Sequence, residues 1–524
     1  MNMIKGLILG SAAGLIAVSG AQAADLPVKA KAVEYVKICS LYGAGFFYIP
    51  GTDTCIKLGG YLRVDTTFNG GNYGTPAWSS DLGQQNRYRD YFASRSRMAL
   101  TVDTRTATEY GVVRTFGQGN FSFNNLGTNN PTTLATFPAS SSNGLNLTVG
   151  GGYVSVDQLF IQFAGFTFGK SLSAFSNPWN GNHGTTAALL GGGDYTTGVN
   201  NIQYTAQFGN GVSATIGLDD PSSYNRTAVL NLSVPIAGLA VTGAGANAYA
   251  GTHAPDIVGN IRVDQAWGLF QLSGALHEVN ASYNTLGASG APTALSEISG
   301  HPDSKWGGAV MASLNIKNIP TGAGDDIKID ATFATGDTKQ VISGTTNSPS
   351  FAMFGGTSRA GAYQSIGFGQ TADAVYLPGF TDGIKLVDAW GLRAAYNHNW
   401  DPYWSSTLFG SYSQVRYGGS AADITTAKGA WCAAYNLGKG APGGATLSAD
   451  YTCNPDYNVA QVALTTRWTP VRNLTFSAEV GAFFLDQKFT GAAVLAATAP
   501  KPTTVYEYKD QSTVYLQVRA QRNF

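Results

Sequence analysis

The chain has 524 residues, of which 66 are glycine, 12% are aromatic and only 12% carry a charge, about half the usual ~25%. Its 32 acidic and 32 basic residues leave no positive excess, which argues against nucleic acid as a partner, and its 44% apolar content argues against a disordered chain. Only the N-terminus offers an apolar stretch approaching the ~20 residues of a membrane helix. The remainder predicts an all-β protein.

Residues 1–23 are predicted to be a signal peptide. Lys5 supplies the charged start, residues 6–18 form a short apolar run, and Ala21-Gln22-Ala23 is a small-x-small cleavage site. A single membrane anchor is the alternative, but the run is too short and no stop-transfer charges follow it. We therefore expect an exported chain with a polar periplasmic extension at 24–38 and one continuous barrel domain at 39–524.

The four cysteines fit an exported protein. Cys39 and Cys55 form one local pair, and Cys432 and Cys453 form another. Three connectivities are possible, and we expect the local one, in which each disulfide closes a short loop worth about 3 kcal/mol. A metal site is the alternative; it is disfavoured because neither pair has CxxC spacing and the five histidines are scattered. We expect neither a metal nor another cofactor.

Alternation between apolar and polar residues is the main structural signal. In 57–68 and in 92–105 the apolar side chains share one phase, and every charged side chain takes the opposite phase. The same alternation recurs in three later segments: 326–335, 474–484 and 514–519. A period of two indicates a strand with one apolar and one polar face.

Two architectures share this pattern, a soluble β-sandwich and a transmembrane β-barrel. The segments run about 9 to 13 residues, the length that crosses a membrane at a tilt. Aromatic residues gather near strand ends, as at Trp390, Trp400 and Trp404, and tight connections such as 468–474 alternate with long ones such as 418–430 and 485–505. These features favour an antiparallel outer-membrane barrel. Local patterns support about fourteen strands, with large insertions at 120–152, 282–302 and 341–370.

The segment 39–64, CSLYGAGFFYIPGTDTCIKLGGYLRV, resembles the start of the alphaproteobacterial porin family. Shorter matches lie around 468–474 and at 518–524. The resemblance implies a homotrimer of sixteen-stranded barrels that sits among outer-membrane lipid and lipopolysaccharide and passes small hydrophilic solutes. It also implies that Phe524 is part of a C-terminal signal for the barrel assembly machinery. Arg522 departs from that signal, because its position should face lipid.

In wider relatives of that family, the loop after the fifth strand folds into the barrel. Residues 157–170 resemble the end of that strand, so the loop is expected at about 171–199, with His183 and Asp194 in it. Selectivity in such a pore depends on the charges that face the narrow zone. The candidate wall charges are Arg63, Arg95, Arg97, Arg105 and Arg114. Because arginines outnumber acidic loop residues, we expect a mild preference for anions.

The expected function is passive diffusion through a general porin. A substrate-specific channel and a barrel that carries adhesive surface loops are the alternatives. An enzyme is not expected, since the sequence has no GxSxG nucleophile elbow, and Phe168-Gly169-Lys170-Ser171 lacks the first glycine of a phosphate-binding loop because position 164 is Ala164.

Overall fold

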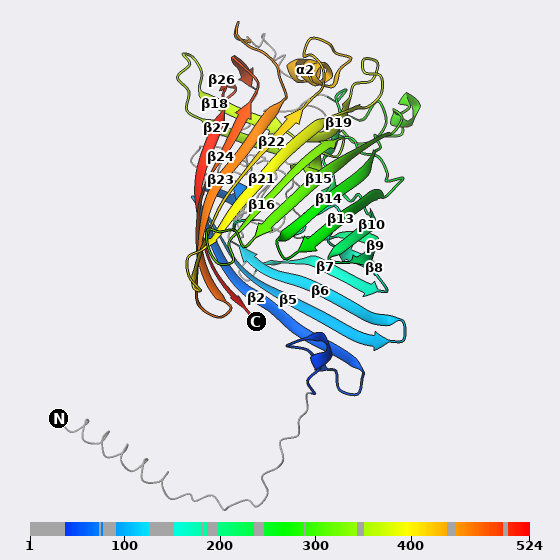
Figure 1. Ribbon diagram of the computed structural model, residues 1–524. Coiled ribbons are helices and arrows are strands. Elements are labelled where there is room, and N and C mark those ends of the chain that lie inside the picture. The colour runs from blue at the N-terminus through cyan, green and yellow to red at the C-terminus, as the bar shows by residue number, and fades with distance from the viewer. Residues whose placement is uncertain are drawn as a thin grey trace, which may run out of the picture.

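Figure 1 shows the computed structural model of the chain. The predicted signal peptide and most of the predicted extension lie outside the residues that the structure describes. The described ranges are 37–72, 75–76, 91–124, 151–179, 183–185, 197–234, 246–287, 290–342, 350–437, 447–495 and 501–524.

Sixteen antiparallel strands form a closed barrel. Each strand pairs with the next along the chain, and the last pairs with the first, so the sheet has no free edge. The strands are β2 (Thr54–Phe68), β5 (Phe92–Thr108), β6 (Gly111–Asn124), β7 (Tyr153–Phe163), β8 (Phe166–Ser171), β9 (Val199–Gly209), β10 (Val212–Asp219), β13 (Asp256–Gln265), β14 (Gly268–Val279), β15 (Lys305–Lys317), β16 (Asp326–Thr335), β21 (Asp388–Asn399), β22 (Trp404–Arg416), β23 (Tyr457–Val471), β24 (Leu474–Gln487) and β27 (Gln511–Asn523).

The two faces of the barrel wall follow the sequence alternation. In β2, Leu58 and Leu62 are 59% and 51% exposed and point outward, whereas Asp65 is fully buried on the inside. In β5, Leu100 points outward and Arg95 inward. The outward apolar belt suits lipid, and the inward polar face suits a wet lumen, which is the term used below for the barrel interior. The predicted facing of the charged residues in these strands is confirmed.

The two ends of the barrel differ in their connections. At one end the strands are joined by tight turns, such as Ala164-Gly165 between β7 and β8 and Arg472-Asn473 between β23 and β24. Ala164 and Asn473 adopt positive φ angles there, as tight hairpin turns require. At the other end, long loops join the strands and gather at the top of Figure 1. The predicted alternation of short and long connections is confirmed.

The long loops build secondary structure of their own. Two four-stranded sheets form from loop segments, and each contains a parallel pairing between segments far apart in the sequence. One sheet comprises β12 (Ala246–Asn247), β11 (Ala228–Asn231), β19 (Ala372–Tyr376) and β20 (Lys385–Leu386), and the other β17 (Ser350–Gly355), β18 (Gln364–Gln370), β26 (Thr504–Tyr508) and β25 (Ala492–Leu495). In the described ranges, the remaining short elements are β1 (Phe47–Tyr48), β3 (Gly70–Asn72), β4 (Thr75–Pro76) and four 3₁₀ turns at Ser40–Tyr42, Ser223–Asn225, Ser296–Ser299 and Thr338–Gln340.

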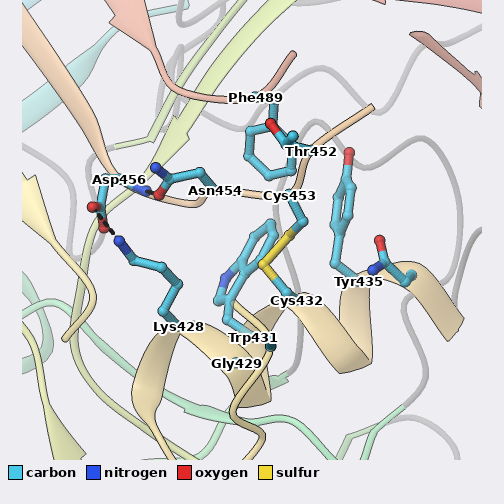
Figure 2. The surroundings of a disulfide bond; sticks show 12 residues. Lys428, Gly429, Trp431, Cys432, Tyr435, Thr452, Cys453, Asn454, Asp456 and Phe489 are labelled. Atoms are coloured by element: carbon cyan, nitrogen blue, oxygen red, sulfur yellow. Dashed lines mark hydrogen bonds and ion pairs between the residues drawn. A yellow bond between two sulfur atoms is a disulfide. The ribbon is translucent and has the colours of Figure 1, made fainter. Parts of the chain in front are cut away.

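Both disulfides have the expected local connectivity, and they lie at opposite ends of the barrel. Cys39 bonds to Cys55 at the tight-turn end, and Cys432 bonds to Cys453 among the long loops. Figure 2 shows the second bond beside the ring of Trp431, whose side chain is fully buried. Each bond closes a short loop, which stabilises the folded chain by restricting the unfolded one.

Two details of the sequence interpretation were wrong. The segment 418–430 was expected to be only loop, but residues from Ala427 onward begin helix α2 (Ala427–Leu437), which is held by the disulfide and by stacking of Trp431 on Tyr435. The segment 157–170 is not one strand end, because it contains the second half of β7, a tight turn and nearly all of β8. Among the described residues, no helix is both long and apolar enough to span a membrane.

Ion pairs also connect the long loops. Arg359 donates two hydrogen bonds to Asp450, at 2.9 and 2.6 Å. The hydrogen bonds from this guanidinium hold the pKa of Asp450 well below its usual range. The carboxylate therefore stays charged throughout the neutral and mildly acidic range, and the link between the two loops persists there.

Candidate functional site

The loop between β8 and β9 enters the lumen as soon as β8 ends. The side chain of Asn260 on β13 donates to the carbonyl of Ala174 at 2.6 Å, and Gln271 on β14 donates to the carbonyl of Ser176 at 2.8 Å. Phe175 is buried between these contacts. Inward polar side chains thus satisfy the backbone of an irregular segment, which is the condition for such a segment at membrane depth.

Farther along, the same loop reaches the wall formed by β23, β24 and β27. Arg467 donates to the carbonyl of His183 at 3.1 Å, and Arg519 donates to the carbonyl of Thr185 at 2.8 Å. The backbone N–H of Thr185 donates to Glu479 at 2.5 Å. The described parts of the loop therefore contact β13 and β14 first and β23, β24 and β27 afterwards. Their positions inside the lumen match the predicted inward loop, and Asp194 lies outside the described residues.

Gly184 allows this close approach. A Cβ atom at this position would lie 2.3 Å from Oε2 of Glu479 and 2.4 Å from the ring of Phe409. No L-side chain fits at these distances, so glycine is required for the loop to sit against the wall. Glu479 is itself fixed, because it accepts hydrogen bonds from Thr465 at 2.5 Å and Tyr515 at 2.8 Å.

Three of the five predicted wall arginines lie together on β2 and β5. Arg95 forms an ion pair with Asp65 at 2.6 Å, and both side chains are almost completely buried. Arg519, which also binds the loop, pairs with the same carboxylate. Arg63 lies over the ring of Tyr61, 4.5 Å from its centroid. Asp65 is therefore the shared counter-ion of this wall.

Arg97 belongs to the same group. It is the cross-strand neighbour of Arg63, and its guanidinium donates to Ser122 at 3.0 Å. Arg63 in turn donates to Gln521 on β27 at 2.8 Å. Neutral side chains thus hold these two guanidinium groups against the wall, which fixes the cations without removing their charge.

The other two predicted arginines lie elsewhere. Arg105 and Arg114 both pair with Asp103, at 3.1 and 3.0 Å, near the tight-turn end of the barrel. Arg105 follows Arg95 by ten residues on one strand, which corresponds to about 33 Å at ~3.3 Å per residue. The five arginines therefore form two groups at different depths, and only the group around Asp65 is near the described loop contacts.

Sequence reasoning did not include Arg467, Arg519 or Glu479 among the site residues. All three point inward from the last strands, and the alternating phase of those strands carried the signal. On the wall formed by β2, β5, β23, β24 and β27, five arginines face two carboxylates among the described residues near the loop, so positive charge is in excess on this wall; Asp157 accepts from Thr197 of the loop on the β7 side. The arginines are Arg63, Arg95, Arg97, Arg467 and Arg519, and the carboxylates are Asp65 and Glu479.

No group of three His, Cys, Asp or Glu side chains suited to a metal ion occurs within the described ranges. The arrangement consists of fixed charges around a narrowed polar passage, and such charges act on a passing ion through its electrostatic energy.

Comparison with known proteins agrees with this architecture. Porin Omp2b of Brucella abortus (strain 2308) is 34% identical over 273 residues, which cover 51% of this chain and 63% of the relative. Omp2b of Brucella melitensis biotype 1 is 34% identical over 274 residues, with the same coverage. The match thus spans less than two thirds of these curated relatives.

The crystal structure of the outer membrane channel DcaP of Acinetobacter baumannii has a TM-score of 0.53 and 13% identity to this chain. The alignment covers 91% of this chain and 99% of DcaP, so the fold is shared. The family model of the porin subfamily matches residues 25–516. The closed barrel with its outward apolar belt, together with this match over most of the sequence, shows that the chain is a multi-pass outer-membrane protein and belongs to the porin subfamily.

Proposed function

We propose that the protein forms a water-filled channel for passive diffusion of small hydrophilic solutes and ions. The observation that carries this proposal is the loop between β8 and β9, which lies inside a closed barrel and is bound to its wall by Arg467, Arg519 and Glu479. A loop fixed in this way narrows the lumen but does not block it. Small polar solutes then cross without complete dehydration, and larger ones are excluded.

The charges near the loop give the channel a mild preference for anions. Five arginines and two carboxylates lie on the wall of β2, β5, β23, β24 and β27 beside the loop, and the net positive charge of this wall lowers the energy of an anion there relative to a cation. Arg105 and Arg114 at the tight-turn end share one carboxylate, Asp103, so the positive excess of this pair is one charge, smaller than that beside the loop. The group around Asp65 therefore sets most of the selectivity.

Reconstitution of the protein into a planar bilayer tests this function. We expect large ohmic conductance steps, and a reversal potential of the sign for anion selectivity when a KCl gradient is applied. A silent bilayer, despite folded and detergent-soluble barrels, would contradict the channel function and favour a barrel that only carries its surface loops. Clear cation selectivity would contradict only the role of the arginines.

The assembly that accompanies this function is a homotrimer embedded in outer-membrane lipid and lipopolysaccharide. In the proposed route to the membrane, residues 1–23 are removed during export. The barrel assembly machinery then inserts the chain, and Phe524 is part of the signal that it recognises. Conductance steps that arrive in groups of three, and a trimer mass in native mass spectrometry, are the expected signs of this assembly.

A further inference from the structure

A cavity of about 340 Å³ lies inside the lumen between the inward loop and the barrel wall. The loop contributes Trp179 and His183, and the wall contributes side chains from β16, β21, β22 and β23. The volume falls within the range of pockets that hold small organic molecules. The cavity is separate from the buried Asp65 group, although Arg467 belongs both to its lining and to the loop contacts.

Two cations line this cavity. Lys328 on β16 pairs with Asp326 at 3.2 Å. Arg467 on β23 donates to the hydroxyl of Thr407 at 2.6 Å and to the carbonyl of His183 at 3.1 Å. With Asp326 as the one carboxylate in the lining, these charged groups carry a net charge of one positive unit. A single negative charge complements such a site better than a multiply charged anion does.

The two loop residues that line the cavity carry buried polar atoms without a protein partner. Within the described part of the chain, Nε1 of Trp179 and Nε2 of His183 are buried and make no hydrogen bond. A buried polar atom in this state costs roughly 1–3 kcal/mol. The two rings lie 5.6 Å apart and present flat surfaces. Two aromatic rings in the same lining as two cations suit a flat organic anion.

We propose that this cavity is a binding subsite for small organic monocarboxylates that carry a flat ring. The carboxylate lies between Lys328 and Arg467, and the ring lies against Trp179 and His183. The amide of Asn397, which also lines the cavity, adds a neutral polar contact. The inference rests on the proposed channel function, because it makes such anions solutes that pause on their path through the lumen.

Benzoate is the probe, and the current of the open channel in a planar bilayer is the measurement. We expect benzoate to reduce the chloride current saturably, and its uncharged analogue benzamide not to do so. Replacement of Lys328 by glutamine should raise the half-blocking benzoate concentration about tenfold, the loss expected for one charge-assisted hydrogen bond. Among the described residues, Lys328 donates no hydrogen bond to the loop, so this change leaves the loop anchored.

Lys317→Gln is the matched control. Lys317 on β15 pairs with Asp264 at 3.2 Å, the same distance as the Lys328–Asp326 pair, but it does not line the cavity. This variant should respond to benzoate as the unmodified protein does. Equal sensitivity of the Lys328→Gln variant and the unmodified protein, or an open channel without saturable block, would overturn the proposal.

Calorimetric titration of benzoate into the detergent-solubilised protein separates the subsite from the channel. Saturable heat that weakens in Lys328→Gln supports the subsite even if the bilayer carries no current, in which case only the channel function has failed. If current flows but neither block nor binding heat is detected, the subsite has failed and the channel function stands.

Discussion

Asp65 is the shared counter-ion of two arginines on the wall near the inward loop. It is fully buried, and it pairs with Arg95 from β5 and with Arg519 from β27. Removing one partner of a buried ion pair costs about 3–5 kcal/mol, because the remaining charge stays buried and uncompensated. The same carboxylate is one of two that offset the five arginines on the wall of β2, β5, β23, β24 and β27, so it affects stability and selectivity together.

We therefore expect Asp65→Asn to strengthen the anion preference and to lower the unfolding free energy by about 3 kcal/mol. Reversal potentials in a KCl gradient and urea unfolding measure the two effects. Asp264→Asn is the control, because Asp264 also pairs with two cations, Arg262 at 3.0 Å and Lys317 at 3.2 Å, but is 42% exposed at the tight-turn end. If both variants behave alike, Asp65 has no special role.

Gly184 is the second residue with a measurable consequence. An alanine methyl would overlap Glu479 and Phe409, and overpacking of this kind costs about 1–3 kcal/mol. The overlap falls on Glu479, which accepts the N–H of Thr185, so it strains the packing and weakens this anchoring hydrogen bond at the same time, and the loop should be held less tightly at the wall. We expect Gly184→Ala to raise single-channel conductance and current noise. Gly251→Ala, where the added methyl meets no atom, should change neither, and unaltered conductance in Gly184→Ala would show that the loop does not limit the current.

At this scale the sequence predicts which way a side chain faces but not how deep it lies. Arg95 and Arg105 share one phase of one strand, so the alternation predicts that both face inward and does not distinguish their depths. Their separation along β5 places one near the loop and the other near the turns. Depth depends on strand register across the closed barrel, which pairs Asp65 with Arg95 and Cys55 with Arg105, and a single sequence does not contain that register.

Strands were the elements that the sequence predicted best. The predicted segment 326–335 coincides with β16, and the predicted 57–68 and 92–105 differ from β2 and β5 by three residues at one end. The expected loop at 171–199 begins where β8 ends, and it ends where β9 begins. Helix α2 was missed because its stability comes from tertiary contacts, namely the disulfide and the stacking of Trp431, and not from a long amphipathic repeat.

This origin of α2 predicts its response to loss of the disulfide. The Cys432–Cys453 bond joins residues 21 apart, which corresponds to about 3 kcal/mol in the chain-entropy model. In a double Cys→Ser variant we expect α2 to open, with faster protease cleavage of the loop and a red-shifted emission of Trp431. The barrel itself should remain folded, because its strands pair without this bond.

The matching change at Cys39 and Cys55 is the control for the α2 experiment. That bond lies at the opposite end of the barrel, so its removal should leave protease cleavage near α2 unchanged. Equal cleavage of the unmodified protein and the Cys432/Cys453 variant would mean that aromatic packing alone holds the helix.

For the whole molecule, the decisive step is the pairing of the first strand with the last. β2 and β27 are more than 400 residues apart in sequence, and their register joins Tyr61 to Asn523 and Phe68 to Leu516. Contacts of such high sequence separation form late and carry a large loop-closure cost. The sixteen-strand count was implied by family resemblance, since local patterns alone supported about fourteen strands. Closure of the barrel depends on the pairing of distant strands, so no local segment of the sequence predicts it.

Gly60 lies at this closing seam. Its N–H donates to the carbonyl of Phe524 at 3.2 Å, and the N–H of Phe524 donates back to the carbonyl of Gly60 at 3.1 Å. Gly60 has a φ of +152°, and a Cβ there would lie 2.0 Å from the carbonyl oxygen of Ala99 on β5. A side chain at this position would therefore push β2 away from β5 at the point where β2 also meets the end of the chain.

We expect Gly60→Ala to reduce the fraction of protein that reaches the closed barrel severalfold, both in cells and on refolding into detergent. The measurement is the heat-modifiable band in semi-native electrophoresis, because a closed barrel migrates differently before and after boiling. Gly119→Ala is the matched control: Gly119 lies in β6, and an added methyl would meet no atom within 4 Å. A Gly60→Ala barrel that closes as efficiently as the control would show that the seam tolerates a shift of β2, and that closure is determined by the rest of the β2–β27 register.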